Sequence, residues 1–340
     1  MPTRRRAQHG VSMIALWFDG KLTLREVPKP GPRTGEALIQ VMLAGICDTD
    51  IQILQGYSNF QGIPGHEFVG RVVECDRSEW LNKRVVGEIN VACGACDWCR
   101  RELGRHCPHR TVVGIVNRPG AFAEFLALPT GNLHEVPESI SDRAAVFVEP
   151  LAAAAEILEQ MRLEPGVSVA VLGDGKLGLL VAQVLRHAGA QVTVIGKHGW
   201  KLELARGWGI KAVEAKAAEL APASFAMVVE ATGSPAGLEE ALRLVEPRGT
   251  VVMKSTFQEM AHFDTAQFVV NEITLRGSRC GNFAVALGLL QSGHLDVLPL
   301  ISRTFPLESG LEAFEYMKAN PCLKVLLVPT QTPGRLPALL

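Results

Sequence analysis

The chain has 340 residues, of which 47% are hydrophobic, and a formal net charge of −1 at pH 7. This length and apolar content predict two domains with cores of their own, and the near-zero charge gives no indication of a nucleic-acid partner. No apolar run is long enough to span a bilayer, since the longest, at 144–158, is interrupted by charged residues and a proline. Arg4, Arg5 and Arg6 are followed by no apolar signal segment, and we expect them to form a solvated tail, with a targeting or nucleic-acid-binding arm as the alternative. We therefore expect a cytoplasmic protein with no membrane partner.

The first part of the chain reads as mainly β. Residues 12–45, 68–74 and 84–89 alternate apolar and polar positions between Pro and Gly residues, which is typical of short strands and turns. We predict a small barrel-like domain over residues 1–150. A helix is expected from Ser141 onward to about residue 161.

After Pro165 and Gly166 short apolar strands alternate with segments of helical spacing, which predicts βαβ units and a doubly wound parallel sheet over residues 151–282. The expected strands are 167–173, 191–195, 227–231, 249–253 and 273–278, and the expected helices are 176–187, 200–207, 235–245 and 283–292. Residues 283–340 are predicted to rejoin the first domain through segments 304–307 and 325–328. The fold class is therefore α/β, with a β domain and a nucleotide-type domain.

Two groups of residues carry metal-binding chemistry. His66 and Glu67 adjoin in a glycine-flanked loop, and Cys47 ends an apolar run upstream. A second group is more specific, because four cysteines within fifteen residues can close a tetrahedral thiolate cage around structural zinc. An iron–sulfur cluster is the alternative that such spacing allows. The four residues are Cys93, Cys96, Cys99 and Cys107, whereas the isolated Cys75, Cys280 and Cys322 are expected to be small buried side chains.

A glycine-rich loop follows the first strand of the second domain and opens its helix. Gly173 would make the tight turn, Gly175 would let backbone amides approach a pyrophosphate, and Gly178 would allow close helix–strand packing. The helix N-terminus would then face the negative charge. The loop predicts dinucleotide binding by Gly173, Asp174, Gly175, Lys176, Leu177 and Gly178.

The end of the next strand bears on the choice between NAD and NADP. An NAD site would place Asp or Glu there, on the adenosine ribose hydroxyls, but this sequence reads Gly196-Lys197-His198. A 2′-phosphate would find room at Gly196 and positive charge at Lys197 and His198. The sequence therefore favours NADP, and NAD stays possible if Lys197 and Lys201 only form the solvated start of a helix.

The order of these motifs resembles one family over almost the whole chain. Segment 45–50 (Gly-Ile-Cys-Asp-Thr-Asp), Gly-His-Glu at 65–67, the four cysteines, Glu-Pro-Leu at 149–151 and the glycine-rich loop follow one another as in the zinc-containing medium-chain alcohol dehydrogenases. The segments at 65–67 and 149–151 look most similar to the polyol, threonine and sugar dehydrogenase branch. The resemblance implies a GroES-like catalytic domain, a Rossmann domain, a catalytic and a structural zinc ion, and a homodimer or homotetramer.

The resemblance also implies roles for single residues. Cys47 and His66 would hold the catalytic zinc, with Glu67 or Glu149 completing the protein ligands. Asp50 matches a carboxylate that orients the ligands.

Two further residues concern the path of the proton. Thr49 matches the hydroxyl that takes the substrate alcohol's proton. Gln52 stands where relatives often carry a His that passes the proton to solvent, and because Gln does not titrate this path is in doubt. Tyr57, Phe60, Asn117, Arg118, Phe122 and Cys280 are candidates for the substrate cleft, Arg118 as a cation for an anionic or polyhydroxylated substrate.

The favoured function is zinc-dependent hydride transfer between NAD(P) and an alcohol or polyol, or its carbonyl form. Alternatives are a threonine- or glucose-dehydrogenase-like activity, a zinc-free quinone or enone reductase, and a non-catalytic protein that binds nucleotide and zinc. Cys47 and His66 argue against the zinc-free reductase, and together with the two glutamates against the non-catalytic protein.

Overall fold

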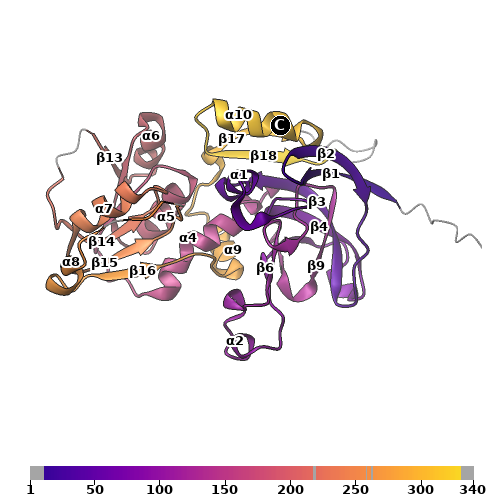
Figure 1. Ribbon diagram of the computed structural model, residues 1–340, viewed down its shortest axis with the longest axis horizontal. Coiled ribbons are helices and arrows are strands. Elements are labelled where there is room, and N and C mark those ends of the chain that lie inside the picture. The colour runs from indigo at the N-terminus through magenta and orange to yellow at the C-terminus, as the bar shows by residue number, and fades with distance from the viewer. Residues whose placement is uncertain (1–10, 217–219, 258, 262, 331–340) are drawn as a thin grey trace, which may run out of the picture. The chain divides into compact units, whose positions relative to one another are not determined.

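The computed structural model describes residues 11–216, 220–257, 259–261 and 263–330, so Arg4–Arg6 lie outside the described residues. The chain divides into two compact units, shown in Figure 1: a first unit that ends at Phe147 and resumes at Ile301, and a second unit, Val148–Leu300. Within the described ranges no helix is long and apolar enough to cross a membrane.

The first unit is built around a mixed seven-stranded sheet in the order β10-β5-β4-β3-β18-β17, with β9 also paired to β3. Strand β3 (Glu36–Ile46) is central, and Leu38, Ile39 and Ile46 on it are almost completely buried. Its sheet partners are β4 (Glu67–Cys75), β5 (Arg84–Gly87), β9 (Phe125–Pro129), β10 (Leu133–Glu135), β17 (Ile301–Pro306) and β18 (Lys324–Val328).

Smaller elements complete this unit. They are the hairpin β1 (Ser12–Phe18) and β2 (Leu22–Pro28), the three-stranded sheet β6 (Asn90–Val91), β7 (Thr111–Val113) and β8 (Asn117–Arg118), and the helices α1 (Asp48–Leu54), α2 (Asp97–Arg100), α3 (Asp142–Ala145) and α10 (Gly310–Ala319). The helix expected from Ser141 is interrupted: α3 is one short turn capped by the Ser141 hydroxyl, and the longer helix starts at Val148.

The second unit contains a six-stranded sheet in the order β13-β12-β11-β14-β15-β16, in which every neighbouring pair is parallel. Its strands are β11 (Ser168–Leu172), β12 (Gln191–Gly196), β13 (Lys211–Glu214), β14 (Phe225–Glu230), β15 (Val245–Met253) and β16 (Thr274–Gly277). Its helices are α4 (Val148–Gln160), α5 (Lys176–His187), α6 (Gly199–Gly207), α7 (Pro235–Leu244), α8 (Ala266–Val270) and α9 (Phe283–Gln291). The strand order reverses between β11 and β14, the place where doubly wound sheets bind ligands.

The chain returns to the first unit at Ile301, whereas the sequence analysis predicts that it returns at about residue 283. The difference is α9, which stays with the second unit and packs on α4. Gly281 allows this approach, because a Cβ there would lie 1.9 Å from the carbonyl oxygen of Ala152. The two strand-like segments predicted near the C-terminus correspond to β17 and β18.

Candidate functional site

Cys47, His66 and Glu67 lie together where β3 ends and β4 begins. Cys47 follows β3 and caps α1, while Glu67 opens β4 opposite Gly45. One donor atom from each of the three residues lies within 4.8 Å of the others. Thiolate, imidazole and carboxylate are zinc ligands, so this donor set fits a zinc ion.

Asp50 braces the two segments that carry these donors. Its Oδ2 accepts the backbone N–H of Cys47 at 2.8 Å and its Oδ1 accepts that of Gly65 at 3.2 Å. The same Oδ1 lies 3.3 Å from His66 Nδ1, which leaves Nε2 of the ring for a metal. Burial lowers the pKa of His66, but Asp50 and Cys47 outweigh it and hold the pKa well above its usual value.

The bend that presents His66 depends on Gly65. Its φ is +96°, and a Cβ would lie 2.5 Å from the ring of Phe122. Phe122 itself is fully buried, which makes it a packing residue rather than part of a substrate cleft.

Lys324, the first residue of β18, is a site residue that the sequence analysis missed. It is fully buried, contacts Glu67 Oε2 as an ion pair, and donates to the carbonyl oxygen of Ile46 at 3.3 Å. Burial lowers the pKa of Lys324 to about 8, against the opposing effect of nearby Cys47 and aspartates. Gly45 leaves room for the pair, since a Cβ there would lie 2.7 Å from Glu67 Oε2. A lysine at the start of an otherwise apolar strand was the only signal for it in the sequence.

Three other predicted residues take different places. The Thr49 hydroxyl lies 3.9 Å from Cys47 Sγ, and Gln52 follows one turn later on α1. Glu149 is the second residue of α4 and belongs to the second unit, so its role as a zinc ligand stays a prediction.

Arg118 was expected to face the substrate, but its guanidinium is engaged within the first unit. It bonds to Glu36 at 3.2 Å, to the Thr111 hydroxyl at 3.0 Å and to the Ala127 carbonyl at 3.2 Å. These contacts join β8 to β3 and β9, so Arg118 has a structural role.

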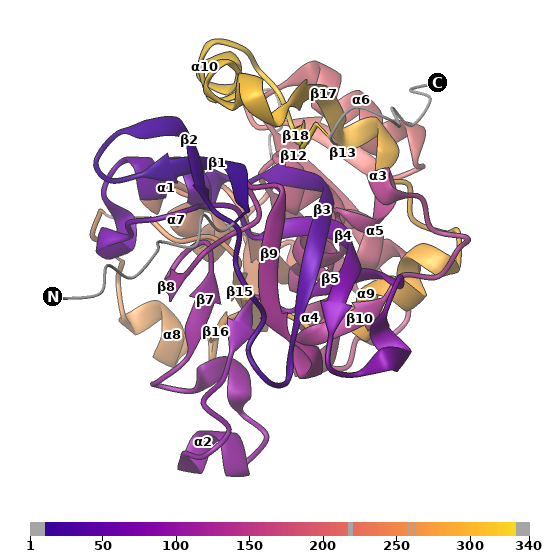
Figure 2. The same ribbon diagram turned by 90° about the vertical axis from the view of Figure 1, so that its right-hand side faces the viewer.

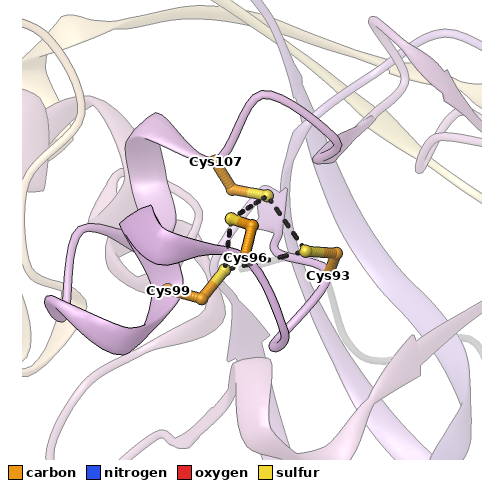
Figure 3. A group of neighbouring side chains, drawn as sticks. All are labelled: Cys93, Cys96, Cys99 and Cys107. Carbon is orange, nitrogen blue, oxygen red and sulfur yellow. Dashed lines mark hydrogen bonds between the residues drawn. The ribbon is translucent and has the colours of Figure 1, made fainter.

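The four predicted lobe cysteines converge, as Figure 3 shows, and Figure 2 shows their lobe with α2 extending away from the strands of the first unit. Neighbouring sulfurs lie 3.4–3.9 Å apart. A regular tetrahedron with Zn–S bonds of about 2.3 Å has edges of about 3.8 Å, so the group fits zinc. Backbone amides of Ala95 and Cys96 lower the pKa of Cys93 to about 6, which favours the metal-binding thiolate.

The isolated cysteines differ from expectation. Cys75, Cys280 and Cys322 are each partly exposed rather than buried. Cys75 ends β4, where its sulfur accepts the Arg77 N–H at 3.3 Å.

The glycine-rich loop has the backbone geometry that a dinucleotide requires. A Cβ at Gly173 would lie 2.5 Å from the Ala231 carbonyl and one at Gly178 would lie 2.1 Å from the Gly173 carbonyl, whereas Gly175 faces open space. Lys176 and Leu177 form the first turn of α5, and the Lys176 side chain is buried. The loop therefore fits a pyrophosphate at the N-terminus of α5.

The room expected at Gly196 for a 2′-phosphate is absent. The side chain of Asp174 fills it, with Oδ2 2.6 Å from where a Cβ of Gly196 would stand. The carboxylate also accepts the backbone N–H groups of Lys197 and His198.

Two further buried charges lie at the carboxyl edge of this sheet and were not predicted. Glu230, fully buried at the end of β14, accepts the Thr232 N–H at 2.7 Å and two hydroxyls, those of Thr232 and Ser255. Lys254, just past β15, donates to the Ala153 carbonyl, the Ser278 hydroxyl and the Arg279 carbonyl.

Comparison with known proteins places this arrangement in a family. Residues 33–138 match the alcohol dehydrogenase GroES-like domain, and residues 177–292 match the zinc-binding dehydrogenase domain. The L-threonine 3-dehydrogenase of Legionella pneumophila strain Corby is 30% identical over 339 residues, which cover 93% of this chain and 99% of that protein.

Solved structures agree with these matches. A zinc-binding dehydrogenase of Sinorhizobium meliloti 1021 bound to NADP has a TM-score of 0.86 at 28% identity, and an alcohol dehydrogenase of Escherichia coli CFT073 complexed with NADH has a TM-score of 0.88 at 27% identity. Each comparison covers 94% of this chain and 100% of the other. Since both domain types match in sequence order and the threonine dehydrogenase spans nearly the whole chain, the protein belongs to the zinc-containing medium-chain alcohol dehydrogenase family.

Proposed function

We propose that this chain is a zinc-dependent oxidoreductase that transfers hydride between an alcohol or polyol, or its carbonyl form, and a nicotinamide dinucleotide. The observation that carries the proposal is the group formed by Cys47, His66 and Glu67, braced by Asp50. Bound zinc supplies a Lewis acid for the substrate oxygen, and the bound nicotinamide accepts or donates the hydride.

The chain's own residues orient the site and handle the proton. Asp50 fixes the Cys47 and Gly65 segments through two backbone amides, so that the donors stay in place. We infer that the Thr49 hydroxyl accepts the proton of a substrate alcohol, and its position 3.9 Å from Cys47 Sγ supports this role. The Gln52 amide does not titrate, so we infer that the proton leaves through the hydroxyl of Thr49 and water rather than through residue 52.

The zinc content and ligand set are part of this proposal. We infer two zinc ions per chain, one in the lobe and one at the Cys47 group. Glu67 shares one carboxylate oxygen with Lys324, and Glu149 remains the other candidate for a ligand. A cytoplasmic location and a homodimer or homotetramer stay predictions from the sequence.

A second candidate substrate is a hydroxy amino acid. A relative that matches 93% of this chain is named L-threonine 3-dehydrogenase, which favours a test of L-threonine beside simple alcohols, polyols and sugars.

The test measures reduced-nicotinamide absorbance over a panel of alcohols, polyols, sugars and L-threonine, each with NAD and with NADP. Wild-type enzyme is expected to turn over at least one member, whereas Cys47→Ser should lose turnover and the zinc of its site but keep the lobe zinc. Cys75→Ser is the matched control, because its thiol lies outside both cysteine-containing metal groups. A Cys47→Ser enzyme that keeps most of its turnover would contradict the proposal.

A further inference from the structure

The carboxylate of Asp174 lies at the end of β12, although the residue belongs to the glycine-rich loop after β11. Its Oδ2 accepts the backbone N–H of Lys197 at 2.8 Å and that of His198 at 2.6 Å. The His198 ring nitrogen Nδ1 lies 3.0 Å from the same oxygen. One side chain of the loop thus joins two neighbouring strand ends.

The two amides form an anion-binding site that the protein itself occupies. They stand at the N-terminus of α6, where free N–H groups and the helix dipole favour a negative group. Burial raises the pKa of Asp174, but the bonds from the His198 backbone and ring and from the Lys197 amide outweigh burial and lower the pKa. The occupant is therefore a carboxylate anion at neutral pH.

Gly196 is what admits this carboxylate. A Cβ on Gly196 would lie 2.5 Å from Asp174 Cβ, so no larger residue fits while Asp174 keeps its position. The side chain of Asp174 is 9% exposed, which shows that it fills the strand end rather than extending into solvent.

A second carboxylate adds negative charge at the same turn. Glu214, at the end of β13, pairs with Gly196 across the sheet, and a Cβ on Gly199 would lie 3.5 Å from its Oε1. This turn therefore carries two carboxylates, those of Asp174 and Glu214, instead of an empty anion site.

We propose that Asp174 selects the dinucleotide that lacks a 2′-phosphate, so that the enzyme uses NAD in preference to NADP. The inference rests on the proposed function, since it concerns the cofactor of that reaction. With the pyrophosphate at the glycine-rich loop, the adenosine ribose lies toward the end of β12. A ribose hydroxyl can donate a hydrogen bond to Asp174, whereas a 2′-phosphate meets its negative charge and finds both amides taken.

Binding without turnover tests the proposal. Isothermal titration of the zinc-loaded enzyme with NAD, NADP, adenosine 5′-monophosphate and adenosine 2′,5′-bisphosphate gives four affinities. Wild type is expected to bind NAD at least about tenfold more tightly than NADP, with the same order for the two fragments, because a like charge beside the site costs about 1.4 kcal/mol or more.

Two variants remove the carboxylate from the anion site. Asp174→Asn removes the charge, and Asp174→Gly removes the whole side chain from a loop that already contains glycines. Each is expected to raise NADP and bisphosphate affinity about tenfold or more relative to NAD. Asp264→Asn is the matched control, because Asp264 also accepts a backbone N–H, that of Ala266 at 2.9 Å, but lies just before α8 instead of in the glycine-rich loop.

A ligand-free measurement tests the packing. Gly196→Ala is expected to lower the melting temperature of the wild-type background and to do so much less in the Asp174→Gly background. Wild type that prefers NADP, with the preference unchanged by Asp174→Asn and Asp174→Gly, would overturn the inference alone. Wild type that binds neither dinucleotide would remove the proposed function and the inference with it.

Discussion

Glu67 and Lys324 are two fully buried ions of opposite charge beside the metal donors of the first unit. Taking each charge out of water is costly, and their mutual attraction offsets that cost only while both are present. The Lys324 ammonium also lies over the ring of Phe147 in a cation–π contact, with Nζ 5.7 Å from the ring centre. Loss of either residue therefore leaves the charge of the other buried in the core without this counter-ion.

Lys324→Met is therefore expected to destabilise the first unit by about 3–5 kcal/mol, because Glu67 would remain buried without the ammonium of Lys324. Guanidinium unfolding, followed by circular dichroism, measures the loss. Adding Glu67→Gln to the Lys324→Met variant should recover much of the lost free energy of unfolding. The control is Lys318→Met, whose partner Glu315 is exposed on the same side of α10 and whose loss should cost less than about 1 kcal/mol. Equal effects at the two lysines would contradict the buried-pair argument.

Asp50→Asn is expected to weaken zinc binding at the Cys47 group by about 10–100-fold, because an amide cannot accept both backbone N–H groups that Asp50 holds. Competition with a chromophoric chelator measures the affinity. The exposed neighbour Asp48 provides the control, and Asp48→Asn should leave the affinity unchanged. Similar zinc affinity in Asp50→Asn and wild type would show that Asp50 does not brace the donors.

At single positions the sequence predicts chemistry better than it predicts partners. Cys47 and His66 could be proposed as metal donors from the sequence because zinc ligands in proteins come from a few side-chain types. The ion pair of Glu67 with Lys324 could not, since the two residues are 257 positions apart and only the sheet register joins them. Lys197 and His198 were read as free cations because nothing local in the sequence indicates that Asp174 folds over Gly196.

Among the elements, the cysteine lobe contains little regular structure of its own. It has a short helix, α2, and the buried Cys107, so the metal would supply most of the energy that holds it together.

Cys96→Ser should therefore lower lobe stability and zinc content before it affects chemistry. Zinc content per chain and the melting temperature, both read against Cys322→Ser as the control outside the lobe, test this expectation. Wild-type melting with full zinc content in Cys96→Ser would rule out a structural metal in the lobe.

Lys254 lies just after β15 and connects three parts of the second unit. Its ammonium donates hydrogen bonds to α4 and to the segment that follows β16. Burial lowers its pKa to about 8, with Cys280 and nearby glutamates opposing. Its usual value in an unfolded chain is about 10.4. The unfolded state therefore binds more protons between these two values, and this residue's contribution to stability rises with pH across that window and is constant below it.

Lys254→Met is expected to lose about 1–3 kcal/mol of stability at pH 7, because the three oxygens lose their donor. In the wild type, titration of Lys254 makes the protein more stable as the pH rises from about 8 to 10.5, and the variant should lack this increase. Urea unfolding at a series of pH values separates the two effects. A wild-type pH dependence in the variant would show that Lys254 is not the titrating group.

Elements with strong periodicity were predicted to within one or two residues, as α5 and α9 show. Some elements that depend on pairing with distant parts of the chain were not predicted. Strand β13 has only four residues at a sheet edge, and α10 follows a segment that reads as strand, so neither had a clear local pattern.

For the whole molecule, the discontinuity of the first unit matters most. Strand β18 lies between β3 and β17 inside its sheet, so the unit requires residues from both ends of the chain. The second unit, by contrast, is one continuous stretch.

A chain that ends at Cys322 is therefore expected to lose the zinc of the Cys47 group while retaining dinucleotide binding by the second unit. Zinc content and isothermal titration with NAD measure the two properties. A chain that ends at Thr330 keeps β18 and is the control. Full zinc content in the shorter chain would show that β18 is dispensable for the site.

The place of Lys324 also sets an order of events during synthesis. The ribosome completes residues 148–300 before it makes β18, and domains commonly fold as units while the chain emerges. The second unit can thus fold while Glu67 is still solvated, before its counter-ion Lys324 has been synthesised. The proposed metal site can therefore be completed only after Lys324 has been synthesised, and a chain terminated before that residue would contain the second unit but leave Glu67 without this counter-ion.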